Sequence, residues 1–190
     1  MGQLIASLFV SIDNMMVAKN EDMSWVLGDF DPEMGADMDA EVMRSMQAIL
    51  LGHTTYDIMA QHWPKMTEAE SPGADLMNGT PKLVFSRTLE KAEWGSYGNA
   101  TVVKEVVPAE IQRMKSQSNG SMVIMGSASL VQRFTNLRLV DEYVLSLHPV
   151  ILGDGAKPLF KDIKDRHDLR VAKTKTYGNG VVLLKLQPMG

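Results

Sequence analysis

Apolar segments typical of buried β-strands alternate with helix-like segments along the first three-quarters of the 190-residue chain. The strand-like segments read LIASLFVSI, AILLG, PKLVFSRT, ATVVKEV and SMVIM. Such alternation predicts a mainly parallel sheet with helices on both faces. Farther along, LRVAKTKTY and VVLLKLQP flank GNG at residues 178–180, which predicts an antiparallel hairpin. We therefore predict one mixed-sheet α/β domain over residues 1–190.

Composition excludes several classes of function. The chain has no cysteine, which excludes disulfides, thiolate metal sites and cysteine nucleophiles. Its 4 histidines are scattered, so no metal site is predicted. A net charge of −4 without a basic face predicts no nucleic-acid partner. No apolar run approaches the roughly 18–20 residues that span a bilayer, and MGQLIASLFVSID does not resemble a secretory leader. We expect a cytoplasmic protein without a membrane partner.

Residues 13–37 are predicted to form a long loop, and loops of that length are uncommon unless they are functional or mobile. A helix is expected over residues 37–47, with its apolar residues on one face. The stretch from Asn20 to Met43 contains acidic residues and no lysine or arginine. This charge argues against a polyanionic substrate beside the loop.

Three predicted strands end in residues that suit phosphate groups. In an open α/β sheet, ligands bind beyond the carboxyl ends of the strands. Glycine there admits a ligand to the backbone, the following helix N-terminus attracts anions, and arginine can hold a phosphate through two hydrogen bonds. For any one site, a simple helix N-cap is the alternative. No P-loop or G-x-G-x-x-G pattern is present. The three ends are Gly52-His53-Thr54-Thr55, Ser86-Arg87-Thr88 and Gly126-Ser127-Ala128-Ser129.

The order of these motifs resembles the dihydrofolate reductase-like superfamily. More narrowly, it is similar to the riboflavin-biosynthesis reductase C-terminal domain (RibD C-terminal) family. The resemblance rests on LIASLFVSID, MSW, ILLGHTTYDIM, LVFSRT, VIMGSASLVQRF and LVDEYVLSLHPVILGDGAKPLF, and it runs from about residue 4 to residue 186. The last of these motifs is the most specific.

The resemblance implies an NADP-dependent oxidoreductase that binds NADPH along the carboxyl edge of the sheet. It also implies a homodimer and hydride transfer to a small heterocyclic or ribosylamino substrate. The expected preference for NADPH over NADH rests on Arg87 alone. The implied cofactor contacts are Gly52, His53, Thr54 and Thr55 for the phosphates, Ser86 and Arg87 for the adenosine ribose and its 2′-phosphate, and Gly126, Ser127, Ala128, Ser129 and Leu130 for the pyrophosphate and the nicotinamide half.

Two residues are candidates for contact with the substrate. Asp13 would border the nicotinamide, and a carboxyl group in a partly apolar cleft can have a raised pKa and relay a proton. The alternative is that Asp13 caps a turn after its strand. Trp25, in MSW, would touch substrate or pin the loop by packing. Dihydrofolate reductases place an acid soon after a similar segment, but Asp29, Asp31 and Asp37 cannot be told apart by alignment, so none of them is assigned that role.

Three positions depart from the family pattern. Ser127 and Asn14 stand where glycine is usual, and His53 stands where arginine is common. These departures favour a second hypothesis, a catalytically inactive nucleotide-binding or interaction module with the same fold. Hydride transfer to a candidate substrate would separate the two hypotheses. A third alternative is flavin binding, which would make the purified protein yellow.

Overall fold

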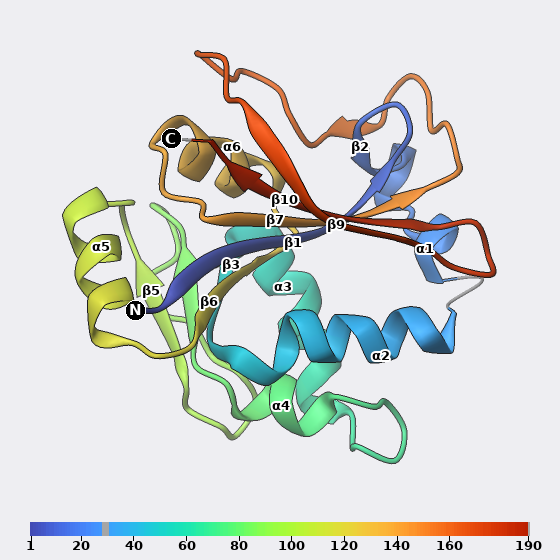
Figure 1. The fold of residues 1–190 in the computed structure, drawn as a ribbon. Helices are drawn as coiled ribbons and strands as arrows, with labels where there is room; N and C mark the ends of the chain where they lie inside the picture. The colour runs from blue at the N-terminus through green and yellow to red at the C-terminus, as the bar shows by residue number, and fades with distance from the viewer. Residues whose placement is uncertain (28–30, 190) are drawn as a thin grey trace.

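In the computed structural model, which describes residues 1–27 and 31–189, ten strands and six helices follow one another along the described chain (Figure 1). The strands are β1 (Gln3–Ser11), β2 (Met15–Val17), β3 (Met46–Gly52), β4 (Lys82–Phe85), β5 (Ala100–Val103), β6 (Ser121–Met125), β7 (Glu142–His148), β8 (Lys157–Pro158), β9 (Leu169–Thr176) and β10 (Val182–Pro188). The helices are α1 (Ser24–Leu27), α2 (Pro32–Glu41), α3 (His53–His62), α4 (Ala74–Gly79), α5 (Pro108–Gln117) and α6 (Ala128–Asn136).

The main sheet has eight strands in the order β5-β4-β3-β6-β1-β7-β10-β9. All neighbours from β5 to β7 are parallel, and β10 and β9 continue the sheet as an antiparallel hairpin. The expected single mixed-sheet α/β domain is thereby confirmed. Because β1, β3, β4, β6 and β7 run in the same direction, their carboxyl ends meet at one edge of the sheet.

The central strands read as nearly continuous apolar runs because helices cover both of their faces. Along β1, Leu4 and Leu8 face one core and contact the layer that contains Phe134 of α6. Ile5 belongs to the second core, which includes the fully buried Trp94. Helices α5 and α6 contribute to the first core, and α2, α3 and α4 to the second. Burying one large apolar side chain contributes about 1.5–3 kcal/mol, so the two cores stabilise the sheet that carries the candidate site.

The helix expected over residues 37–47 was placed wrongly. Helix α2 begins at Pro32 and ends at Glu41. The Asp31 carboxylate caps its start, accepting hydrogen bonds from the backbone N–H groups of Glu33 and Met34, and proline suits the first helical position. The apolar spacing that suggested a helix as far as residue 47 runs on into β3. The capping signal at Asp31-Pro32 was the more reliable guide.

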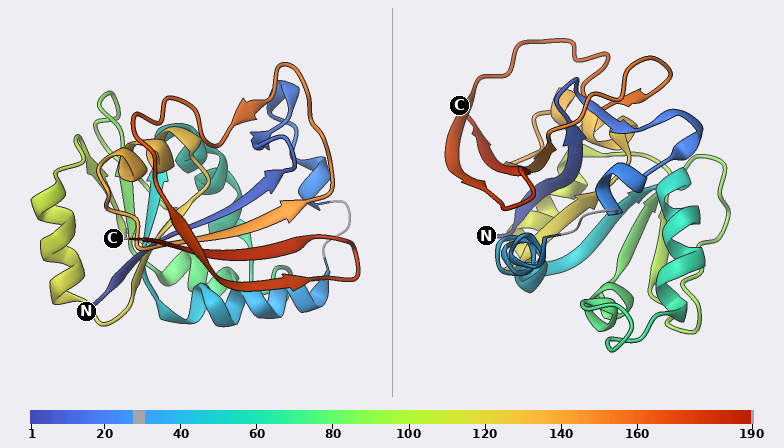
Figure 2. Two further views of the ribbon diagram at one scale, coloured as in Figure 1. Left: turned by 45° about the horizontal axis from the view of Figure 1, so that its top comes forward. Right: turned by 90° about the vertical axis from the view of Figure 1, so that its right-hand side faces the viewer.

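Ion pairs join α2 to the β9–β10 hairpin, and both views of Figure 2 show these elements side by side. Asp37 binds Lys175 at 2.5 Å, and Glu41 binds Lys173 at 2.7 Å and Lys185 at 2.9 Å. Asp37 and Glu41 of the acidic stretch are therefore paired with lysines from distant strands, which offsets part of the negative charge of the stretch. Within the described residues, every helix is too short or too polar to cross a membrane.

Candidate functional site

The carboxyl ends of β3, β4 and β6 meet as the sequence predicts. Gly52 pairs in register with Phe85, so the segments after β3 and β4 start side by side. Gly52 also lies against the next strand: a Cβ placed on it would overlap the hydroxyl of Ser127. A Cβ on Gly126 would lie 2.8 Å from Cγ2 of Thr55. Both glycines therefore permit a close approach that a larger residue would block.

Two helix N-termini converge at these glycines. Gly52 is the N-cap of α3 and Ser127 is the N-cap of α6, and neither helix end receives a side-chain cap. Uncapped first turns leave backbone N–H groups available to a ligand, and the helix dipoles favour negative charge there. Ser127 is held at φ 58, in the left-handed region that favours glycine. This pair of helix ends suits a phosphate or pyrophosphate.

His53, in the first turn of α3, is joined to the end of β4. Its Nδ1 lies 3.2 Å from the hydroxyl of Ser86, and its Nε2 lies 3.4 Å from Asp57 one turn along the helix. Sequence reasoning missed Asp57, although the i,i+4 spacing was readable. Arg87 is exposed, and across the described residues it makes no hydrogen bond or ion pair. Arg87 is thus a free cation beside the helix ends, whereas His53 is already engaged.

The other expected cofactor contacts divide into two groups. Thr54 and Ser129 are exposed in the first turns of α3 and α6, and Ala128 begins α6 beside Ser127. Leu130 differs, because its side chain is 5% exposed in the core and its N–H already donates to the carbonyl of Ser127. We assign Leu130 to the core rather than to the site, which corrects the expectation for this residue.

Asp13 lies just beyond β1 and fixes the loop that follows β7. Its carboxylate accepts hydrogen bonds from Oγ of Ser11 at 2.5 Å and from the backbone N–H groups of Leu152 at 3.1 Å and Gly153 at 2.9 Å. These bonds, that of Ser11 above all, lower the pKa of Asp13 to about 2. The expectation of a raised pKa was wrong, and the alternative role, holding a turn, is the one observed.

Asn14, where the resemblance led us to expect glycine, is held by its backbone conformation and by contacts of its side chain. It adopts φ 66, a left-handed conformation that asparagine tolerates better than most residues. Its side-chain amide donates a hydrogen bond to the carbonyl of Phe160 at 3.2 Å and accepts one from the backbone N–H of Phe160 at 3.3 Å. The sequence gave no sign of this partner, which lies far along the chain.

The acids considered as proton donors have structural partners. Asp31 caps α2 and also accepts a hydrogen bond from Gly178 N–H at 3.2 Å. Asp37 accepts hydrogen bonds from Lys175 and from the Tyr177 hydroxyl, and these lower its pKa. Asp29 lies outside the described residues. Asp31 and Asp37 are therefore both engaged in structural contacts.

Trp25 packs against His148, a neighbour that the sequence did not reveal. The two ring centroids lie 5.1 Å apart with an interplanar angle of 84°. His148 ends β7 and is buried, and burial lowers its pKa. Packing is the observed role of Trp25, and contact with substrate stays a prediction.

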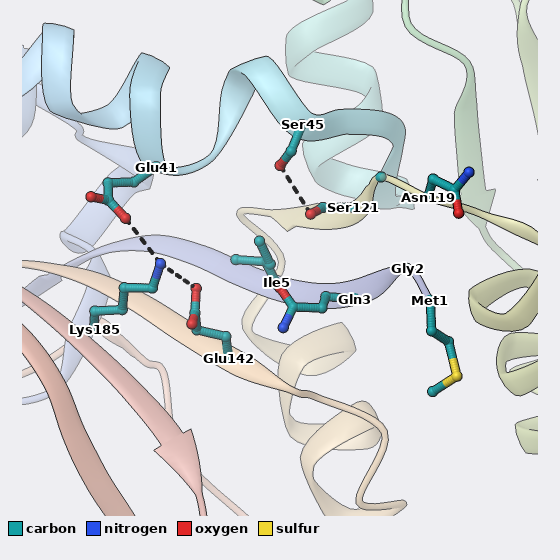
Figure 3. A pocket seen from close by; sticks show the side chains of 11 residues that line it. Met1, Gly2, Gln3, Ile5, Glu41, Ser45, Asn119, Ser121, Glu142 and Lys185 are labelled. Atoms are coloured by element: carbon teal, nitrogen blue, oxygen red, sulfur yellow. Dashed lines mark hydrogen bonds and ion pairs between the residues drawn. The ribbon is translucent and has the colours of Figure 1, made fainter.

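Two pockets lie away from this edge of the sheet. One, of about 190 Å³, is lined by residues near the amino ends of the strands (Figure 3). In it Lys185 lies between Glu41 and Glu142, so its charge is already neutralised. The other, of about 580 Å³, is lined by residues between Glu90 and Val102 beside the edge strand β5. Neither includes a predicted site residue.

Known proteins resemble the chain over most of its length. The family model described as the RibD C-terminal domain matches residues 3–183. The uncharacterized protein YyaP of Bacillus subtilis (strain 168) is 33% identical over 182 residues, covering 95% of this chain and 92% of YyaP. YwjB of the same organism is 26% identical over 174 residues, covering 92% of this chain and 91% of YwjB.

Solved structures agree in fold. A protein from Shewanella sp. PV-4 that is named for riboflavin biosynthesis has a TM-score of 0.80 at 18% identity, with 99% of both chains covered. The diaminohydroxyphosphoribosylaminopyrimidine deaminase/5-amino-6-(5-phosphoribosylamino)uracil reductase of Thermotoga maritima has a TM-score of 0.66 at 15% identity. The match covers 99% of this chain and 57% of the Thermotoga chain.

Proposed function

Because this chain belongs to the RibD C-terminal domain family, we propose that it is an NADPH-dependent reductase of a small heterocyclic or ribosylamino substrate. Its dihydrofolate reductase-like fold is the one the resemblance led us to expect. The Thermotoga maritima relative in fold carries the name of such a reductase. These similarities support the reaction class, and the chemistry of the sheet edge supports the cofactor.

The observation that carries the proposal is the meeting of two helix N-termini without side-chain caps beside Arg87, which has no polar partner among the described residues. A dinucleotide brings a pyrophosphate, which suits helix N-termini, and NADPH adds a 2′-phosphate. Arg87 would pair with that phosphate through its planar guanidinium. Gly52 and Gly126 would let Ser127 and Thr55 pack closely at the base of the site.

When bound, the nicotinamide would supply the hydride, and the protein would supply placement. Ser86 is buried, and its hydroxyl accepts a hydrogen bond from the backbone N–H of Leu89 at 3.0 Å and lies 3.2 Å from Nδ1 of His53, so it would fix the end of β4 that carries Arg87. Asp13 is ionised at neutral pH because its pKa is about 2, so it would keep the loop after β7 in place rather than donate a proton. The proton that accompanies the hydride would come from another group or from water.

A titration with NADPH, NADH and NADP⁺ tests the proposal, with quenching of the 3 tryptophans as the signal. Arg87→Ala should weaken NADPH by about 10- to 100-fold, which corresponds to the loss of one charge-assisted contact, and leave NADH nearly unchanged. Arg113→Ala, at an exposed arginine on α5, controls for the change in net charge. Equal weakening of both nucleotides would remove the assignment of Arg87.

A catalytically inactive nucleotide-binding module is the second candidate. It is favoured by the Ser127 hydroxyl, which fills the space over Gly52, and by the low pKa of Asp13. Oxidation of NADPH with a panel of carbonyl and imine substrates separates the candidates. Tight NADPH binding without any turnover would favour the inactive module.

We propose a homodimer on the family resemblance alone. Light scattering coupled to gel filtration should give twice the mass of one chain. A monomer at micromolar concentration would refute this part of the proposal.

A further inference from the structure

Trp25 and His148 together bury two polar atoms that have no hydrogen-bond partner in the described part of the chain. These atoms are Nε1 of Trp25 and Nε2 of His148. Leaving such an atom buried and unpaired destabilises a protein, and native proteins contain few of them. Here two occur in side chains that touch each other, with ring centroids 5.1 Å apart. A ligand that bonds both atoms would account for their retention at one place.

The pair lies at the functional edge of the sheet. His148 is the last residue of β7 and pairs in register with Ser11, the last residue of β1. Strand β1 lies between β7 and β6, and β6 leads directly into Gly126. Figures 1 and 2 show α1, which carries Trp25, beside the carboxyl ends of β1 and β7. The pair therefore lies on the same edge of the sheet as the helix N-termini, beyond β1 and four residues farther along the strands than the end of β6.

An aromatic wall completes this corner. The ring of Phe9, two residues before the end of β1, meets His148 edge-on with centroids 5.8 Å apart. Phe9 is partly exposed and partly packed against the second core. The loop after β7 is held by the Asp13 carboxylate. Two polar atoms and an aromatic surface thus share a firmly supported corner.

We propose that Trp25 and His148 form the polar end of the substrate site and bind the carbonyl-bearing edge of a planar heterocycle. This assignment rests on the proposed reductase function. An indole N–H can only donate, so it requires an acceptor such as a ring carbonyl. Nε2 of His148 donates or accepts according to its tautomer, and it binds the neighbouring ring nitrogen or a second carbonyl. Phe9 offers an apolar surface for the ring.

The electrostatics of the corner favour a neutral ligand. Burial lowers the pKa of His148, so its imidazole is uncharged at neutral pH. A carboxylate or phosphate at this point would face no compensating charge from the pair. A phosphate on the substrate would therefore lie elsewhere, and the uncharged ring would occupy this corner.

Ligand entry requires the two rings to separate, since both polar atoms are closed to solvent. The indole N–H of Trp25 therefore reports binding directly. Among the 3 tryptophans of the chain, its signal in a ¹H–¹⁵N spectrum is identified by its loss in Trp25→Phe. We choose lumazine as the probe, a bicyclic ring with two carbonyls, and unsubstituted pteridine as the same ring without them.

Lumazine should move the Trp25 indole signal downfield and leave the signals of Trp63 and Trp94 in place. Pteridine should not move the Trp25 signal. His148→Phe keeps an aromatic ring but removes the nitrogen, and it should weaken lumazine by about tenfold, the value of one hydrogen bond near the upper end of its range. His148→Gln, whose amide can reach the place of Nε2, should keep most of the affinity.

The matched control is His62→Phe. His62 also meets a tryptophan edge-on, with its ring centroid 5.4 Å from that of Trp63, but it is exposed. This variant should bind lumazine as the wild type does. His148→Phe should also unfold at the same or a higher denaturant concentration, because it removes an unpaired buried polar atom. A purely structural role would instead lower its stability.

The proposal is overturned if pteridine moves the Trp25 signal as lumazine does, or if His148→Phe binds lumazine like the wild type. It is overturned also if Trp25 does not respond up to the solubility limit of lumazine, with or without NADP⁺. If His148→Phe fails to fold, Trp25→Phe decides by calorimetry, since retained affinity refutes the proposal and lost affinity supports it. The NADPH titration is independent, so failure of the cofactor proposal is recognised separately.

Discussion

The contact between Gly52 and Ser127 makes a quantitative prediction about the base of the candidate site. In the wild-type protein, the methyl group added by Gly52→Ala would overlap Oγ of Ser127 and lie 3.0 Å from its Cβ. Among the described residues, these are the atoms found within 4 Å of that methyl group. The steric cost of Gly52→Ala should therefore depend wholly on Ser127.

Overpacking of this kind costs about 1–3 kcal/mol. Gly52 has φ −79 and ψ 162, which alanine adopts without strain, so its remaining cost is a slightly poorer N-cap. Ser127→Gly alone should change stability little. The variant relieves the left-handed strain at φ 58, which is worth about 1–2 kcal/mol. This gain is offset in part because glycine adds about 0.5–1 kcal/mol of entropy to the unfolded chain. In the double variant the overlap disappears, so the coupling energy should be about 1–3 kcal/mol.

Urea unfolding of the wild type, both single variants and the double variant, followed by circular dichroism, measures this coupling. Gly79→Ala is the control, because a Cβ there meets no described atom within 4 Å, and it should be additive with Ser127→Gly. Additivity of Gly52→Ala and Ser127→Gly to within about 0.5 kcal/mol would refute the close approach of β3 and β6.

Three further variants test the ionisable groups. Asp13→Asn should destabilise the protein at neutral pH. Since the pKa of Asp13 is lowered from 3.8 to about 2, the difference in stability between variant and wild type should vanish as the pH falls through about 2. A difference in stability that persists in acid would contradict this reasoning. The lowered pKa of His148 should cost the wild type stability as the pH falls below 6.5, and His148→Phe should lack that loss in an unfolding series across pH. Asp37→Asn removes the partner of Lys175 and Tyr177; because the pKa of Asp37 is lowered, the variant should be less stable at neutral pH and should match the wild type in acid, as followed by thermal unfolding.

The local sequence was sufficient for most of the fold. Apolar runs mark the parallel strands because a strand covered on both faces has few polar positions, and GNG marks the hairpin because its turn requires residues that accept positive φ, as Gly180 does at 83°. The residues after β3, β4 and β6 identified the candidate site, since parallel strands end at one edge. These features depend on neighbours in sequence, so they can be read without the tertiary structure.

The roles of individual site residues depended on partners far along the chain. Asp13 looked like a proton relay until the structure placed it against the backbone of Leu152 and Gly153, which holds its pKa at about 2. The burial of Trp25 against His148 was equally invisible, as was the overlap of Ser127 with Gly52. The sequence by itself determined which strands and helices form and where a ligand edge arises. Only the packing of strands distant in sequence decided which polar groups at that edge have hydrogen-bond partners and which do not. The reason is that contacts between such strands set the pKa, the burial and the close approach of each group.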